Sequence, residues 1–206
     1  MRLHIRLILT ALFISLNSFS SRAEMTINDL IFNDDNPFHL KILESLPKEG
    51  KIQIGSDDAK HTIIEFFDYF CGYCKKIHPE LIELAASRDD LRVVFVHHPI
   101  LNESSKVIAR IAIAASMQDK AFEFHDSIFS LEGSITNEKL KESIIESGIS
   151  EVKLAIDLDR DEIEKIIKLS SFLAGGVGAR GTPSIFINET FYPGYLPMAR
   201  IEALLN

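Results

Sequence analysis

The sequence predicts an α/β protein in which an all-helical block is inserted between a βαβ half and a ββα half of one sheet. Three observations lead to this class. Residues 62–96 follow a strand, helix and strand pattern, in which β-branched and aromatic runs flank a segment of helical spacing. Residues 99–173 have helical periodicity throughout, and residues 184–204 predict two short strands and a last helix.

The first two dozen residues have the layout of a secretory signal peptide. A short basic start precedes an apolar run at residues 7–19, and Ser21 and Ala23 place small residues around a cut after Ala23. An anchoring helix is the alternative, but the run is short for a bilayer and is interrupted by Asn17. We therefore predict a signal peptide at residues 1–23 that is cleaved on export.

The predicted mature chain is acidic. Removing residues 1–23 takes away three arginines and no acids, so Lys+Arg falls from 22 to 19 against 30 Asp+Glu, and the formal charge falls from −8 to −11. A negative domain repels phosphate backbones, and the sequence has no basic stripe interleaved with aromatic residues. We expect no nucleic-acid partner.

The N-terminal part of the predicted domain begins with short elements. We assign residues 24–50 to an N-terminal extension, in which a short amphipathic run is ended by Pro47. Residues 51–55 alternate in polarity and predict a first short strand. The βαβ unit follows, with two strands that we expect to be parallel and a helix in which Pro79 should produce a kink.

The second half of the chain contains the helical insertion and the ββα unit. We assign residues 99–173 to the insertion, and residues 51–98 with 174–206 to the sheet domain. Helices are predicted at Ser104–Met117, Ala121–Phe129, Asn137–Ser147 and Glu151–Leu173. A glycine-rich segment, a hairpin turning at Asn188 and a closing helix from Pro197 to Leu204 complete the fold.

The chain has only two cysteines, Cys71 and Cys74, and Gly72 and Tyr73 lie between them. The pair follows a predicted strand and starts a predicted helix, so Cys71 falls at the N-cap or first position. Free N–H groups and the positive end of the helix dipole stabilise a thiolate there and lower the pKa of the thiol. Cys74 lies about one turn later, and we expect it to be more buried and to resolve a mixed disulfide by attacking Cys71.

Two other roles for the cysteines are possible. A structural staple is disfavoured because closing so short a loop removes little entropy from the unfolded chain. A structural zinc site takes four ligands, commonly from two hooks of this type, and the sequence has no second hook. His78 could share a helix face with Cys74, and His97, His98 and His125 are distant candidates, but we expect no metal. We expect His78 to be exposed on its helix, and His97 and His98 to lie in a surface turn.

Glu65 lies in an apolar strand, six residues before Cys71. It could reach solvent or pair with a cation, but its apolar neighbours favour a buried carboxylate beneath the cysteines. Burial would raise its pKa and allow it to move a proton for Cys74. Thr182-Pro183 precedes a predicted strand, and a proline in this place is unusual because it cannot donate a backbone hydrogen bond to a sheet. A cis peptide there would free backbone groups of Thr182 to align a substrate strand.

Residues 176–181 match the G-x-G-x-x-G pattern of dinucleotide-binding proteins. That pattern requires a strand before it and a helix after it, whereas here a predicted helix precedes and a strand follows. We therefore reject nucleotide binding and expect the glycines to form a tight exit from a helix.

The stretch FFDYFCGYCKKIHPEL, together with GTPSIFIN far downstream, resembles the DsbA-like thioredoxin-fold family, and most nearly its secreted ScsC-type bacterial members. The resemblance covers about residue 55 to the C-terminus and implies a thioredoxin fold with a lid-like helical insertion. It implies that Cys71 is the nucleophile, Cys74 the resolving cysteine, and Glu65 the family's buried acid. Thr182-Pro183 matches the family's cis-proline loop.

One departure concerns the residues between the cysteines. The oxidant DsbA has Pro-His there, whereas this chain has Gly72 and Tyr73, as the isomerase DsbC does. Loss of the histidine should make the disulfide less oxidising. DsbC-like isomerases also use an N-terminal dimerisation domain, and residues 24–50 are short for one.

The sequence thus predicts an exported, periplasmic thiol–disulfide oxidoreductase with no cofactor beyond its own dithiol. We expect it to act mainly as an oxidase on secreted or periplasmic proteins with cysteines, with Gly72, Tyr73, Thr182 and Pro183 binding substrate. A membrane partner would reset the dithiol, and the protein would be a monomer or small homo-oligomer. The alternatives are an isomerase or reductase, if residues 24–50 oligomerise, a metal-binding secreted protein, and a surface protein with a structural disulfide.

Overall fold

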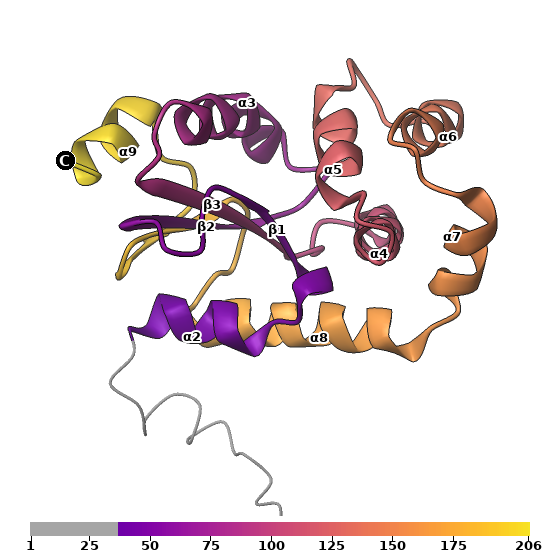
Figure 1. Cartoon of the computed structure of the whole chain (residues 1–206), viewed down its shortest axis with the longest axis horizontal. Helices are drawn as coiled ribbons and strands as arrows, with labels where there is room; N and C mark the ends of the chain where they lie inside the picture. Colours follow the sequence, from indigo (N-terminus) through magenta and orange to yellow (C-terminus); the bar gives the residue numbers. More distant parts are fainter. Residues whose placement is uncertain (1–36) are drawn as a thin grey trace, which may run out of the picture. The chain divides into compact units, whose positions relative to one another are not determined.

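The computed structural model describes residues 37–206 (Figure 1). The predicted signal peptide and the first part of the predicted N-terminal extension lie outside the described residues. Within residues 37–206, no helix is long and apolar enough to cross a membrane.

The described chain forms five strands, eight α-helices and one short 3₁₀-helix. The strands are β1 (Lys51–Ile54), β2 (His61–Phe67), β3 (Leu91–His97), β4 (Ser184–Ile187) and β5 (Thr190–Pro193). The α-helices are α2 (Phe38–Ser45), α3 (Gly72–Ala86), α4 (Glu103–Ser116), α5 (Ala121–Ser130), α6 (Asn137–Glu146), α7 (Glu151–Leu158), α8 (Asp161–Gly176) and α9 (Met198–Leu204), and the 3₁₀-helix η1 is Lys48–Gly50.

The five strands form one sheet in the order β1-β3-β2-β4-β5. Strands β2 and β3 are parallel, and the other three pairs are antiparallel. This arrangement confirms the predicted α/β class, in which a βαβ unit and a C-terminal ββα unit share a sheet and the chain between them is helical. Figure 1 shows α3 and α9 on one face of the sheet and α2 and α8 on the other.

Strands β2 and β3 are buried on both faces, and apolar residues predominate in both. Side chains alternate between the two faces of a strand. Ile63 and Phe95 therefore join the core beneath α3, which extends into the helical insertion, while Ile64 and Val94 join the core over α2 and α8. The register places Glu65 opposite Phe95 on one side and Ile185 on the other, so this carboxyl points toward α3.

The predicted single helix at Glu151–Leu173 is wrong, because the structure has two helices, α7 and α8, that meet at Asp159 and Arg160. Arg160 has an extended backbone, and its side chain bonds Asp157 at 2.8 Å. Asp161, together with Glu162 and Glu164, then places acidic groups in the first turn of α8, where the helix dipole favours them. The break redirects the chain, so that α7 packs on α4 and α8 runs beneath the sheet.

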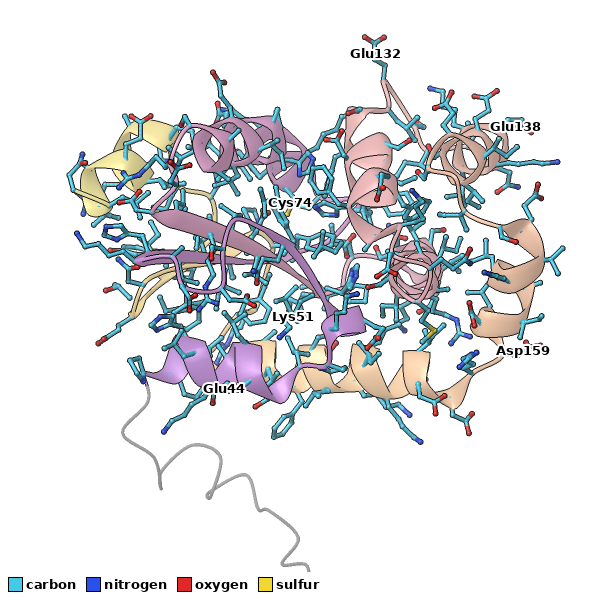
Figure 2. The ribbon with its side chains drawn as sticks, viewed as in Figure 1. Glu44, Lys51, Cys74, Glu132, Glu138 and Asp159 are labelled. Carbon is cyan, nitrogen blue, oxygen red and sulfur yellow. The ribbon has the colours of Figure 1, made fainter. Side chains whose placement is uncertain are left out.

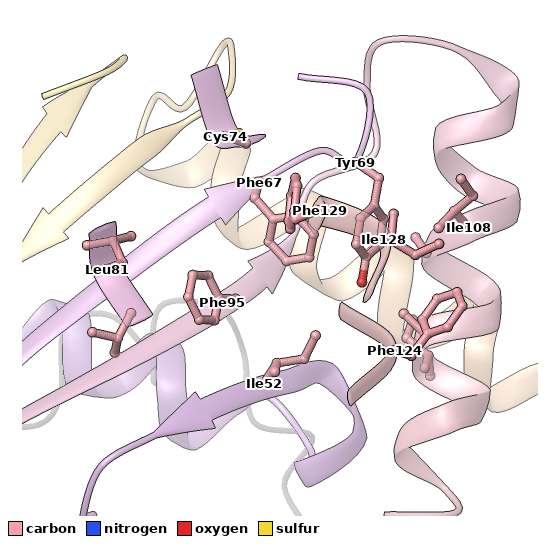
Figure 3. Close-up of a cluster of buried hydrophobic side chains, with 14 of the residues drawn as sticks. Ile52, Phe67, Tyr69, Cys74, Leu81, Phe95, Ile108, Phe124, Ile128 and Phe129 are labelled. Carbon is pink, nitrogen blue, oxygen red and sulfur yellow. The ribbon is translucent and has the colours of Figure 1, made fainter. Parts of the chain in front are cut away.

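Three histidines lie in the core on the α3 face of the sheet, and this contradicts the expectation that His78 is exposed. The others are His97, at the end of β3, and His125 of α5. The ring centroids of His78 and His125 are 4.8 Å apart, and those of His97 and Phe67 are 4.9 Å apart. His98 is also buried, so the expected surface turn is wrong as well. Helix α5 packs on α3 beside the histidines of the α3 face, and Figure 3 shows the aromatic side chains of this core, including Phe67, Phe95 and Phe129.

Burial lowers the pKa of all three of these core histidines, and lowers that of His97 to about 3. Asp126, at 3.0 Å from His78 Nε2, offsets part of the effect for His78 alone. An unfolded chain protonates histidine near its ordinary pKa of 6.5, whereas the folded protein does not. Below pH 6.5 the unfolded state therefore binds more protons than the folded state. Burial of these histidines leaves the free energy of unfolding unaffected above pH 6.5, and this free energy decreases as the pH falls from 6.5 toward 3.

We predict that His97→Phe reduces the sensitivity of the protein to acid. Neither ring nitrogen of His97 has a hydrogen-bond partner among residues 37–206, so phenylalanine removes a titrating group and breaks no bond that the structure describes. Between pH 7 and pH 5, the variant should lose on the order of 2 kcal/mol less free energy of unfolding than the wild type, as measured by urea denaturation. His61→Gln, at the partly exposed start of β2, is the control. Equal losses in wild type and His97→Phe would contradict the prediction.

Candidate active site

Cys71 is the N-cap residue of α3, at the end of the loop that leaves β2. Its sulfur accepts a hydrogen bond from the backbone N–H of Cys74 at 3.4 Å, and in its protonated form it donates to the carbonyl oxygen of Thr182 at 3.1 Å. Cys71 is buried with 7% of its surface exposed, so only a small part of it reaches solvent. The predicted position at the start of a helix is confirmed.

The pKa of Cys71 is lowered from 9.0 to about 6. The largest cause is the hydrogen bond from the Cys74 thiol, which stabilises the Cys71 thiolate. The backbone N–H groups of Tyr73 and Cys74 act in the same direction, while partial burial opposes them. At neutral pH this sulfur is therefore largely a thiolate, the form that takes part in exchange.

Cys74 is fully buried, and Figure 2 shows it between α3 and the sheet. Burial raises its pKa far above the ordinary value, and the bond it donates to Cys71 raises it further. Cys74 therefore stays a protonated donor while Cys71 carries the negative charge. The expected difference in burial between the two cysteines is confirmed.

Glu65 is a buried carboxyl on β2 whose side chain is hydrogen bonded to Cys74. Burial raises its pKa to about 8; the bond to Cys74 lowers it, and the charge of Cys71 raises it. Its Oε1 atom has no hydrogen-bond partner in the described chain. Glu65 is thus mostly protonated at neutral pH, close enough to its pKa to give or take a proton.

The Thr182–Pro183 peptide bond is cis, as the sequence predicted. It brings the carbonyl oxygen of Thr182 to the sulfur of Cys71, although the two residues are 111 positions apart. The structure therefore brings together Cys71, Cys74, Glu65 and the Thr182-Pro183 loop.

Gly72 and Tyr73 lie at the outer rim of this site. A Cβ atom at Gly72 would meet nothing within 4 Å, so the space beside Cys71 is open there. Tyr73 is 59% exposed, and its ring centroid lies 5.3 Å from that of Tyr195. Lys76 Nζ lies 4.8 Å from the centre of the Tyr195 ring, which completes an aromatic and cationic rim.

Sequence reasoning missed two residues of the site, Tyr195 and Asp68. Asp68 is buried three residues before Cys71 and accepts several hydrogen bonds. Its signal in the sequence was an acidic residue between aromatic residues at the end of an apolar strand.

The histidines considered as metal ligands do not join the cysteines in a metal site. His78 bonds Asp126 at 3.0 Å. Among residues 37–206, no group of three or more His, Cys, Asp and Glu side chains is arranged to hold a metal ion. The G-x-G-x-x-G stretch begins at the last residue of α8 and leads to β4. A helix therefore precedes it and a strand follows it, which is the reverse of the order that dinucleotide binding requires.

A family model described as thioredoxin matches residues 47–206. The chain belongs to the thioredoxin family. This membership confirms the resemblance seen in the sequence, and it covers the site from Glu65 to Pro183.

Similar proteins are named for thiol and disulfide chemistry. A probable disulfide bond formation protein D of Bacillus anthracis is 24% identical over 183 residues, which cover 82% of this chain and 84% of that protein. A thioredoxin-like oxidoreductase from Silicibacter pomeroyi has a TM-score of 0.71 at 27% identity, over 87% of this chain and 96% of that one. The catalytic domain of Proteus mirabilis ScsC has the same fold, with a TM-score of 0.69 at 23% identity over 86% and 92% of the two chains.

One curated relative is much longer than this chain. The Na(+)/H(+) antiporter NhaA of Herminiimonas arsenicoxydans is 27% identical over 153 residues, which are 74% of this chain and 24% of the antiporter. The chain therefore spans about a quarter of that relative's length.

We predict that Cys74→Ala raises the pKa of Cys71, while Cys74→Ser changes it much less. Alanine removes the donor that lowers this pKa most, whereas a serine hydroxyl still donates to the Cys71 thiolate. Thiolate absorbance at 240 nm against pH measures the effect, and the rate of iodoacetamide alkylation checks it. A wild-type Cys71 pKa in Cys74→Ala would show that the Cys74 side chain does not stabilise the Cys71 thiolate.

Proposed function

We propose that this protein is a thiol–disulfide oxidoreductase that exchanges disulfides with substrate proteins through Cys71 and Cys74, chiefly as an oxidase. The observation that carries the proposal is the unequal pair of thiols at the start of α3. Cys71 has a pKa near 6 and is 7% exposed, whereas Cys74 has no exposed surface and stays protonated. The names of the similar proteins support the same chemistry.

In the oxidising direction, a substrate thiolate attacks the Cys71 sulfur of the Cys71–Cys74 disulfide. A bond forms between the substrate and Cys71, and Cys74 leaves and takes up a proton. A second substrate thiolate then attacks the substrate sulfur of the mixed disulfide, which yields a substrate disulfide and the Cys71 thiolate. The low pKa of Cys71 makes it a good leaving group in this second step, which favours oxidation of the substrate.

Glu65 is proposed to move the proton for Cys74. When Cys74 leaves the disulfide inside the protein, its negative charge is costly until a proton arrives. The Glu65 carboxyl, with a pKa near 8 and a hydrogen bond to Cys74, is the buried group placed to supply it. In the reverse direction the Glu65 carboxylate takes the proton from Cys74 before this sulfur attacks.

The rim of the site is proposed to bind the substrate chain beside Cys71. Gly72 leaves the approach to the sulfur open, and Tyr73 offers an exposed ring. The backbone of Thr182, held next to the sulfur by Pro183, would pair with an extended substrate segment.

We also propose that the protein is exported to the periplasm, where disulfides persist. The signal-like layout of residues 1–23 supports this, as does a similar solved structure, a periplasmic thioredoxin-like protein from Salmonella enterica. Secreted or periplasmic proteins with cysteines would be its substrates, and a membrane partner would restore the disulfide. On this proposal the protein needs no cofactor beyond its dithiol and works as a monomer or small homo-oligomer.

Isomerisation is the second candidate function, and the Gly72-Tyr73 pair favours it. This pair lacks the histidine that makes a C-x-x-C disulfide strongly oxidising, so the reduced Cys71–Cys74 dithiol would be a stronger reductant. Reduced Cys71 would then attack wrong substrate disulfides, whereas in the oxidising direction substrate thiolates attack the Cys71–Cys74 disulfide.

Refolding of ribonuclease tests the proposed function and its direction. The oxidised protein should accelerate disulfide formation in reduced ribonuclease, and it should act more weakly on scrambled ribonuclease in which all disulfides are formed. Cys71→Ala should abolish turnover. Cys74→Ala should attack a disulfide of scrambled ribonuclease through Cys71 and accumulate a mixed disulfide visible by mass spectrometry, because no second cysteine resolves it. If the double alanine variant kept full activity, the proposed function would be wrong.

We predict that Glu65→Gln slows the exchange steps at Cys74 by about tenfold or more at pH 7, because the amide cannot transfer the proton. The pH dependence near 8 that comes from Glu65 should disappear from the rate. Stopped-flow reduction of the Cys71–Cys74 disulfide measures the rate. Alkylation of reduced Cys71 is the control and should change little. A variant with the wild-type rate and pH profile would refute the proton-transfer role.

A further inference from the structure

Asp68 is a buried carboxylate beside the site that none of the proposed chemical steps uses. It follows β2 directly and lies three residues before Cys71. Oδ1 accepts hydrogen bonds from the N–H of Phe70 at 2.9 Å and the hydroxyl of Ser105 at 2.8 Å. Oδ2 accepts from the N–H groups of Ile100 at 2.9 Å and Leu101 at 3.0 Å. Four short bonds thus meet at one side chain.

These bonds join the loop of Asp68 to a stretch of chain that lies 32 to 37 residues later. Phe70 belongs to the loop that carries Cys71, and Ile100 and Leu101 follow β3. Ser105 lies in the first turn of α4, where it completes the capping box with Asn102. Asp68 therefore ties the cysteine loop to the first helix of the helical insertion.

The backbone of Asp68 acts on Cys71 directly. Its carbonyl oxygen accepts the N–H of Cys71 at 3.0 Å, and its side chain holds the N–H of Phe70 one residue earlier. Together these two bonds fix the turn that places the Cys71 sulfur 3.4 Å from the Cys74 nitrogen. Because hydrogen bonds weaken steeply with poor geometry, a small shift of this turn would weaken the contacts of the sulfur.

A second connection leads from Asp68 toward the Thr182-Pro183 loop. The negative charge of Asp68 acts on His98, and the Nε2 atom of His98 lies 3.1 Å from the carbonyl oxygen of Ala179. Ala179 lies in the segment between α8 and β4 that contains Thr182. The carboxylate of Asp68 thus acts on a histidine that contacts the segment of Thr182.

We propose that Asp68 is a positioning residue for thiol–disulfide exchange, which holds the Cys71 loop against the segment after β3 and the first turn of α4. This inference rests on the proposed function for its catalytic meaning. The geometric part, that Asp68 aligns the Cys71 sulfur with the start of α3, can be tested without turnover.

The direction in which the pKa of Cys71 changes distinguishes a positioning role of Asp68 from a purely electrostatic effect of its charge. A carboxylate near Cys71 disfavours the thiolate, so loss of the charge alone would lower the pKa of Cys71. Loss of alignment would instead weaken the hydrogen bonds to the thiolate and raise this pKa. Asp68→Asn removes the charge and the alignment together, because its amide NH2 group must face N–H groups that the carboxylate accepted.

The experiment compares Asp68→Asn with the wild type by thiolate absorbance against pH and by alkylation of Cys71 at pH 6. We expect the pKa of Cys71 to rise by about one unit in the variant, which lowers the alkylation rate at pH 6 about fivefold. Ribonuclease oxidation should slow in the same variant. Asp90→Asn, which breaks an ion pair with Arg88 at the opposite end of β3, is the matched control and should leave Cys71 unchanged.

Ser105→Ala provides a second variant, because it removes one of the four bonds and keeps the carboxylate. It should slow alkylation at pH 6 about twofold. An unchanged or lowered Cys71 pKa in folded Asp68→Asn overturns the proposal. If that variant does not fold, an unchanged alkylation rate in Ser105→Ala overturns it. A wild type that catalyses no exchange would refute the proposed function, and the pKa comparison would still decide whether Asp68 aligns Cys71.

Discussion

The chemistry of the site depends on the hydrogen bond from the Cys74 thiol to the Cys71 sulfur, which stabilises the Cys71 thiolate. It needs one sulfur at the N-cap of α3 and the other buried one turn later, so the strand-to-helix junction sets both positions. The same burial that keeps Cys74 protonated raises the pKa of Glu65. One feature of the fold, a helix start packed on an apolar sheet, therefore gives three titrating groups three different roles.

The apolar surroundings make this arrangement possible and also costly. Strand β2 places Glu65 and Phe67 on the face that α3 covers, and Figure 3 shows Cys74 above this aromatic core. A polar group in such a core needs a partner, since an unpaired one costs about 1–3 kcal/mol. Glu65 has Cys74 and Asp68 has four donors, whereas His97 has none in the described chain. The core thus combines functional groups with one destabilising histidine.

Sequence patterns predicted the parts of the fold that depend on local signals. Apolar runs gave β2 and β3, helical spacing gave α3, and the Cys71 N-cap followed from its neighbours in sequence. The cis bond at Pro183 was expected from the distant cysteine pair and the family resemblance, because a Thr-Pro pair before a strand is weak evidence alone. The break between α7 and α8 was missed because both halves continue a helical pattern, and only tertiary packing requires the turn. The burial of His78 depends on α5, and the role of Asp68 depends on Ser105, which lies 37 residues away. Neither contact leaves a periodic signal in the sequence.

Equilibration of the protein with glutathione buffers, with the oxidised and reduced forms counted by mass, measures how strongly the Cys71 thiolate stabilises the reduced Cys71–Cys74 pair. A stabilised Cys71 thiolate favours the reduced form, so the Cys71–Cys74 pair should titrate reversibly and be more oxidising than thioredoxin. We expect a potential above about −230 mV, against about −270 mV for thioredoxin. A potential at or below about −270 mV, or cysteines that form no internal disulfide, would contradict the account.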